Sequence, residues 1–318
     1  MLSQDPSAVS RIACIGAGPI GGGWAAYFLA RGYHVRSYLH AAGEYDALMR
    51  LLETAWESLE QIGLAEGASL DNFSWSTDLG EATEHCEFIQ ESVPEVLELK
   101  QALYRTLGDI VDPDVVIASS TSGLSMTDIQ ADCATPERTV VAHPFNPPYL
   151  LPLVEMIGGE KTSPETVDWA ERFYRIAGKS PLVMKKEIPG FIATRLQEAI
   201  WREALHMVAN GEATVEQIDQ AVVNGPGPRW ALMGPCEIFH VGGGEGGMAY
   251  CLDQFGPALK LPWTRLEAPE LTDELRNAMV EGCIEMTRGE DFASLSRKMN
   301  QGLVAIARMK REQAENEQ

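Results

Sequence analysis

Apolar and polar residues alternate in the first forty positions in a way that predicts a strand, a turn, a helix and a second strand. The first strand is the apolar run Ile12 to Ile15, and a glycine-rich turn follows it. The helix after the turn has an apolar face formed by Trp24, Tyr27, Phe28 and Leu29. The second strand is predicted at residues 34–39, so the chain begins with a strand-helix-strand unit.

The same alternation continues through the first half of the chain. Short apolar runs predict strands at residues 87–92, 114–120 and 138–144, and helical periods occupy 44–64 and 94–110. The alternation of strands and helices persists through 166–184. Strands that alternate with helices predict an α/β fold with a mostly parallel sheet and crossover helices.

The pattern changes near residue 188, after which every strong period is helical. The predicted helices lie at 187–211, 214–223, 247–255, 271–289 and 291–313. We therefore predict two domains, an α/β domain at 1–187 and an all-helical domain at 188–318.

The turn after the first strand contains the spacing G-x-G-x-x-G in Gly16, Gly18 and Gly21, with Pro19 and Ile20 between the last two. The first glycine permits a tight turn, the second lets the backbone approach a pyrophosphate, and the third lets helix and strand pack closely. This context predicts a Rossmann-type domain that holds phosphates at the helix N-terminus. A plain strand-to-helix connection is the alternative.

The second strand should end in an acid that binds the adenosine ribose if the cofactor is NAD. Leu39 and His40 occupy that place. Arg36 or His40 could meet the 2'-phosphate of NADP, although no arginine follows the strand, and a hydrophobic wall for the adenosine is a further alternative. We predict NAD, with NADP not excluded.

Composition and charge narrow the range of partners. The chain has 318 residues and a formal net charge of -21, which would repel nucleic acids and anionic membrane surfaces. No run approaches the roughly 18 apolar residues of a membrane span, and the N-terminus lacks the pattern of an export signal. Small soluble ligands are the expected partners.

The six cysteines are scattered and form no C-x-x-C pair. Cys14 falls within the first apolar strand, which suits a buried thiol better than a disulfide or a zinc ligand. The sequence therefore predicts a cytoplasmic protein without a metal site.

Two further segments carry candidate chemistry. The run "ASSTSGLSMTDI" ends one strand in a cluster of hydroxyl groups, and "AHPFNPPYLLPLVE" ends the next strand at a proline-rich bend. Both would lie at the carboxyl edge of the sheet, where open α/β folds bind ligands. Ser122, His143 and Glu155 are thus expected to converge beside a nicotinamide ring.

These motifs resemble the 3-hydroxyacyl-CoA dehydrogenase superfamily over almost the whole chain. The shared motifs are "GAGPIGGG", "ASSTSGL", "HPFNPP", "LVE", "PGFIATRL" and "MGP", in the family's order and spacing. The resemblance implies a hydride transfer between a hydroxyl-bearing carbon and a nicotinamide cofactor.

Carried over residue by residue, the resemblance implies that His143 accepts the proton of the substrate hydroxyl. Glu155 would bind the other ring nitrogen and fix its tautomer, and Ser122 would bind the reacting oxygen. Gln90 and Glu91 match the place where the family's acid approaches the cofactor. A solvated loop acid is the alternative for Glu91.

The chain departs from the acyl-CoA members at Thr194, where they have an asparagine. A threonine hydroxyl still donates one hydrogen bond, but it is shorter and lacks the second donor of the amide.

The substrate is predicted to be a small free hydroxy acid. No lysine precedes Lys100 and the segment 53–98 is acidic, which disfavours the phosphates of CoA. Arg229 can bind a carboxylate bidentately, whereas an ordinary interdomain salt bridge is its alternative. Trp230 and Phe145 offer aromatic faces for a quaternary ammonium group.

The run "FGPALKLPWT" resembles the carnitine 3-dehydrogenase branch of the superfamily. This resemblance implies oxidation of L-carnitine, a zwitterion, to 3-dehydrocarnitine, and a homodimer built through the helical domain. The alternatives are a dehydrogenase of L-gulonate, 3-hydroxybutyrate or 3-hydroxyacyl-CoA, and a non-catalytic, crystallin-like nucleotide-binding protein.

Overall fold

The computed structural model of the protein contains two compact units in its described part. The description covers residues 5–243, 245, 247–257, 261–264, 270, 272–275, 277, 288 and 292–316. The first unit runs to Thr194 and also includes 299–318, whereas the second spans Arg195–Lys298.

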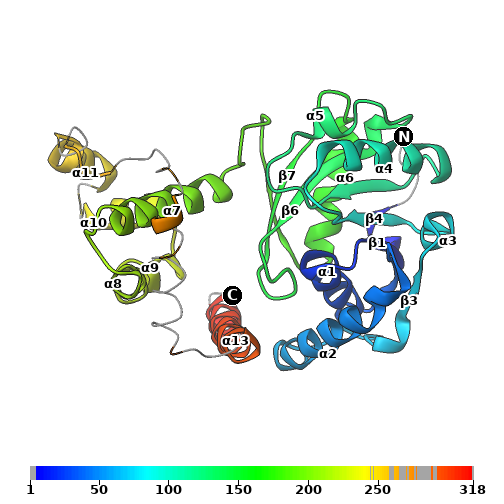
Figure 1. Ribbon diagram of the computed structural model, residues 1–318, viewed down its shortest axis with the longest axis horizontal. Helices are drawn as coiled ribbons and strands as arrows, with labels where there is room; N and C mark the ends of the chain where they lie inside the picture. Colours follow the sequence, from blue (N-terminus) through cyan, green and yellow to red (C-terminus); the bar gives the residue numbers. More distant parts are fainter. Residues whose placement is uncertain are drawn as a thin grey trace. The chain divides into compact units, whose positions relative to one another are not determined.

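The first unit is built on an eight-stranded sheet in the order β3-β2-β1-β4-β5-β6-β7-β8 (Figure 1). The strands are β1 Arg11–Ile15, β2 His34–Tyr38, β3 Phe73–Ser76, β4 Phe88–Glu91, β5 Val116–Ser119, β6 Thr139–Pro144, β7 Leu153–Ile157 and β8 Ser180–Val183. All neighbouring pairs are parallel except β6 and β7. The predicted mostly parallel α/β sheet is confirmed, and the antiparallel return of β7 is a feature that the pattern did not reveal.

Helices cover both faces of this sheet, which explains why its central strands are apolar without interruption. One apolar core joins the sheet to α1 Pro19–Ala30, α2 Tyr45–Ile62 and α6 Pro164–Ile176. The other core joins it to α4 Leu97–Ile110 and α5 Met126–Ile129. The short helix α3 spans Leu79–Thr83, and single 3₁₀ turns lie at η1 Pro6–Ala8, η2 Ala42–Glu44, η3 Leu70–Asn72 and η4 Pro136–Arg138.

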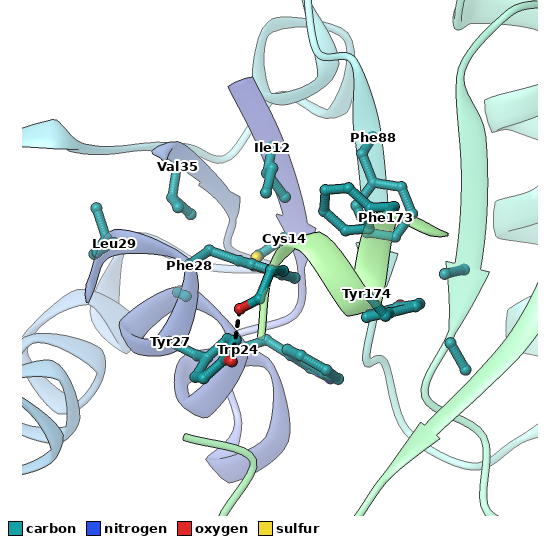
Figure 2. Packing of buried hydrophobic residues seen from close by; sticks show 14 of the residues in the cluster. Ile12, Cys14, Trp24, Tyr27, Phe28, Leu29, Val35, Phe88, Phe173 and Tyr174 are labelled. Carbon is teal, nitrogen blue, oxygen red and sulfur yellow. Dashed lines mark hydrogen bonds between the residues drawn. The ribbon is translucent and has the colours of Figure 1, made fainter. Parts of the chain in front are cut away.

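Aromatic rings dominate the core on the α1 face (Figure 2). Trp24 and Phe28 of α1 stack with ring centroids 5.1 Å apart, and Phe88 of β4 lies 4.2 Å from Phe173 of α6. Such pairs contribute about 0.5–1.5 kcal/mol beyond the area they bury. The helix that carries the glycine turn is therefore fixed firmly against the sheet.

A buried lysine ties α1 to the bend between β6 and β7. The ammonium of Lys179 donates hydrogen bonds to the carbonyl oxygens of Pro148 and Leu151, and it lies 3.7 Å from the ring centroid of Tyr27. Burial lowers the pKa of Lys179 well below 10.5, and the charge of Arg31 lowers it further. The bend after His143 is thereby anchored from inside the protein.

The second unit is helical, as predicted. Its described helices are α7 Ala193–Ala209, α8 Val215–Asn224, α9 Gly227–Trp230, α10 Pro235–Gly242 and α11 Gly247–Phe255. The predicted helix 271–289 falls largely outside the described residues, as does part of the run 255–264. No helix in the described part of the chain is long and apolar enough to cross a membrane.

The last described helix, α13 Phe292–Asn316, joins the first unit in its second half. Arg308 and Arg311 donate hydrogen bonds to the carbonyl oxygens of Gln61 and Ile62, where α2 ends. Cations are favourable there because the helix dipole is negative at its C-terminus.

We expect Lys179→Met to change how stability depends on pH. Between the lowered pKa of Lys179 in the folded state and 10.5 in the unfolded chain, the unfolded state binds more protons, so this lysine makes stability rise with pH. As the pH rises from about 7 to about 9.5, the free energy of unfolding should therefore increase more in the wild type than in the variant, as measured by chemical denaturation. The exposed Lys161→Met is the control, and a parallel change in both variants would contradict the expectation.

Candidate active site

His143 and Glu155 form a buried pair at the end of the sheet. They lie directly opposite each other in the antiparallel register of β6 and β7, so the sheet itself brings their side chains together. His143 Nδ1 lies 3.1 Å from Glu155 Oε2, and the two residues are 7% and 0% exposed. The predicted convergence of these two residues corresponds to a direct contact.

The second oxygen of Glu155 accepts hydrogen bonds from the backbone where α7 begins. Ile192 N donates to Oε1 at 2.9 Å and Ala193 N at 2.6 Å. Burial alone would raise the pKa of Glu155, but hydrogen bonds from His143, Ala193 and Ile192 outweigh it and lower the pKa below 4.5. Glu155 is therefore ionised at neutral pH, and it favours the tautomer with the proton on Nδ1 and a lone pair on Nε2.

Two aromatic rings contact the imidazole. The ring centroids of Phe145 and Phe191 lie 5.1 Å and 5.6 Å from that of His143. Phe191 is buried and has a positive φ of 50°, after Gly190 at φ 70°. This left-handed turn directs the next two amides toward Glu155. Phe191 was not predicted from the sequence, although "PGFI" contains the glycine that signals the turn.

Ser122 and Thr194 lie on other elements than β6 and β7, and they make no hydrogen bond to the pair among the described residues. Ser122 is exposed on the loop after β5, and Thr194 is half-buried in the first turn of α7. Glu95 holds the Ser122 loop, since its Oε1 accepts from Ser122 N at 2.9 Å and Gly123 N at 3.1 Å. Glu95 was also missed, because no local pattern links it to a loop 27 residues away.

Glu91 requires a correction. It is neither a solvated loop acid nor able to offer its side chain to a cofactor, because it is fully buried. Its carboxylate is 2.6 Å from Lys100 Nζ and accepts from Ser119 Oγ at 2.6 Å and Val93 N at 2.7 Å. The neighbouring Gln90 is likewise buried and bonded to the hydroxyls of Tyr174 and Ser120.

The glycine turn has the shape that a dinucleotide requires. A Cβ at Gly21 would lie 2.1 Å from Gly16 O, so only glycine permits this contact between helix and turn. A Cβ at Gly18 would meet no atom within 4 Å, which leaves open space beside the N-terminus of α1. Gly18 is the N-cap and Pro19 begins the helix, so no side chain caps the first-turn amides, including that of Ile20. The backbone there fits a pyrophosphate.

Leu39 also requires a correction. Its side chain is 0% exposed and belongs to the core of the α1 face, so it is not a wall for adenosine. Arg36 is not available for a 2'-phosphate, because its guanidinium donates to Glu81 O at 2.7 Å and Ser74 Oγ at 3.3 Å. His40 is exposed at the end of β2.

The predicted substrate residues Arg229 and Trp230 end the short helix α9 in the second unit. Both are exposed, and no carboxylate pairs with Arg229 within the described part of the chain. The described residues contain no group of histidine, cysteine, aspartate and glutamate side chains able to hold a metal ion.

The fold, its glycine turn and the buried His-Glu pair define a nicotinamide-dependent dehydrogenase. The chain belongs to the 3-hydroxyacyl-CoA dehydrogenase family: the NAD binding domain matches residues 11–188 and the C-terminal domain matches residues 190–282. The predicted family is thereby confirmed, and the cofactor is NAD. The protein is an NAD-dependent 3-hydroxy acid dehydrogenase.

The chain is also similar to individual dehydrogenases, in sequence and in structure. The chain is 56% identical to an L-carnitine dehydrogenase of Streptomyces coelicolor over 96% of each protein. It is 48% identical to an L-carnitine dehydrogenase of Bacillus cereus, over 96% of this chain and 94% of that protein. Among solved structures, it resembles an NAD+-dependent dismutase, 5-formyl-3-hydroxy-2-methylpyridine 4-carboxylic acid 5-dehydrogenase, with a TM-score of 0.82, 30% identity and coverage of 95% and 98%.

Alanine at two glycines should separate packing from cofactor binding. We expect Gly21→Ala to lower the free energy of unfolding by about 1–3 kcal/mol, because the new methyl group would overlap backbone. The free energy of unfolding of Gly18→Ala should lie within about 0.5 kcal/mol of that of the wild type. It should nevertheless weaken NAD binding, because its methyl group lies where the pyrophosphate approaches. Denaturation and NAD titration of both variants test this, and equal stability of the two would contradict it.

Proposed function

We propose that this protein oxidises the 3-hydroxyl group of L-carnitine to give 3-dehydrocarnitine, with NAD as the acceptor. The observation that carries the proposal is the buried contact of His143 with Glu155 in an NAD-dependent dehydrogenase. The choice of substrate is supported by relatives that are 44–56% identical over most of the chain and are L-carnitine dehydrogenases.

In this proposal His143 is the general base. Glu155 occupies the Nδ1 side of the ring, so Nε2 is the nitrogen left to take the proton of the substrate hydroxyl. NAD, when bound, accepts the hydride from the same carbon. The charge that develops on the imidazole is stabilised by the ionised Glu155, and Ser122 and Thr194 hold the reacting oxygen.

The remaining site residues of the proposal bind the two charged groups of L-carnitine. Arg229 binds the carboxylate, which its exposed and unpaired guanidinium in the described part of the chain supports. Phe145 and Trp230 face the trimethylammonium group, each contact contributing about 0.5–2 kcal/mol. Phe145 is suited to this role because its ring already contacts the catalytic imidazole.

The cofactor contacts of the proposal lie in the glycine turn, at Gly16, Gly18, Pro19, Ile20 and Gly21. His40 is retained as a neighbour of the adenosine because it is exposed where β2 ends. The side chains of Leu39 and Glu91 are no longer included.

We also propose that the protein is a homodimer in the cytoplasm. Residues 1–187 would bind the dinucleotide, and residues 188–318 would bind the substrate and form the dimer. An apolar groove of about 550 Å³ between α7 and α8 supports a partner copy. It is lined by apolar residues that include Ile200, Trp201, Ile218 and Val222, and Trp201 is 48% exposed. The cysteines within the described residues are free thiols, as a reducing compartment favours.

We expect His143→Gln to lower kcat for L-carnitine by about 10²- to 10⁴-fold, because the glutamine amide cannot accept the hydroxyl proton. Affinity for NAD should remain within about twofold, since His143 is not part of the glycine turn. Turnover is followed by the absorbance of NADH, and NAD binding by titration. L-gulonate and 3-hydroxybutyryl-CoA serve as control substrates.

Two outcomes would contradict this proposal. A loss below about tenfold in kcat would remove His143 from the role of base. Turnover of a control substrate by the wild type, without turnover of L-carnitine, would leave the role of His143 intact but would contradict L-carnitine as the substrate.

Glu155→Gln should also lower kcat, because a neutral amide no longer fixes the tautomer or stabilises the imidazolium.

Arg229→Met should raise KM for L-carnitine by about 10- to 100-fold, the loss expected for hydrogen bonds to a charged group. NAD affinity should not change. Arg202→Met is the matched control, because Arg202 is another arginine of the helical unit, is partly exposed, and pairs only weakly with Glu198 at 3.6 Å. An equal rise in KM in both variants would indicate a general effect of charge and would contradict a specific role for Arg229.

A further inference from the structure

The end of β2 poses a problem for the recognition of NAD. The family uses NAD, yet the residue where an acid usually binds the adenosine ribose is Leu39. Its side chain is completely buried in the core, so it makes no contact with a ligand. Another group must therefore bind the hydroxyl groups of the adenosine ribose if NAD is bound selectively.

The arginine within β2 does not favour NADP over NAD. Arg36, the arginine within β2, is committed to Glu81 O and Ser74 Oγ. Its guanidinium therefore holds β2 against α3 and β3. The 2'-phosphate that distinguishes NADP gains no partner from this side chain.

A carboxylate reaches the same edge from further along the chain. The 3₁₀ turn η2 folds back so that Glu44 Oε2 accepts a hydrogen bond from His40 N at 3.0 Å. His40 directly follows Leu39, so the carboxylate lies one residue beyond the usual position of the acid. Glu44 is half-buried, and its Oε1 has no hydrogen-bond partner in the part of the chain that the structure describes.

This edge is also tied to the glycine turn. Gly16 N donates to Tyr38 O, the last residue of β2, at 3.1 Å. The ends of β1 and β2 are therefore held together, as a site that spans the pyrophosphate and the adenosine ribose requires.

We propose that Glu44 binds the adenosine ribose hydroxyls of NAD and replaces the acid that is missing at Leu39. The backbone amide of His40 holds one carboxylate oxygen, and the other accepts from the ribose. The same negative charge repels a 2'-phosphate, so Glu44 sets the preference for NAD over NADP.

The test is a titration of the substrate-free protein with NAD and with NADP, read by tryptophan fluorescence. Glu44→Gln should weaken NAD binding by at least about tenfold, the loss expected for a hydrogen bond to a charged group. It should leave NADP binding unchanged or strengthen it, so the ratio of NAD affinity to NADP affinity falls by about tenfold or more. Glu44→Asp keeps the charge but shortens the reach, and it should weaken NAD while NADP stays rejected.

Asp46→Asn is the matched control, because Asp46 is an exposed acid in the first turn of α2 and loses the same charge. Its affinity ratio should stay within about twofold of the wild type. An unchanged ratio in Glu44→Gln, or an equal change in Asp46→Asn, would overturn the proposal. Since no substrate is present, this result is independent of whether L-carnitine is the substrate.

Discussion

The carboxylate of Glu155 is the interaction on which the site depends. A buried carboxylate is costly unless hydrogen bonds satisfy it, and here one oxygen faces His143 while the other accepts two backbone amides at the start of α7. The same group thus orients the imidazole of His143 and fixes the backbone at the start of α7. A change at Glu155 would disturb the orientation of this ring and the local backbone together.

A second polar network supports the neighbouring edge of the sheet. The buried pair of Glu91 and Lys100 joins the ends of β4 and β5 to α4, and Glu95 holds the loop that carries Ser122. Breaking a buried ion pair is strongly destabilising, because it leaves one charge without a partner. The hydroxyl-rich loop is therefore positioned by charged groups of β4, of α4 and of the loop between them.

Local patterns predicted much of this arrangement. The glycine spacing indicated the turn before α1 because a Cβ at Gly21 has no room, and alternating periods indicated the parallel sheet. The same patterns misled at Leu39, whose side chain packs into the core directly after β2 ends. Glu44 and Phe191 were missed, because their importance comes from contacts that have no period in the sequence.

The sequence by itself determined the α/β class, the helical second part and the residue types available for dehydrogenase chemistry, since side-chain periodicity and glycine sterics are local properties. Only the tertiary structure decided that β7 runs antiparallel and so sets Glu155 opposite His143. It also decided that Glu91 is buried in an ion pair while Glu44 reaches the end of β2. Burial and hydrogen-bond partners depend on distant segments, and the strand register that brings those segments together forms only when the sheet does.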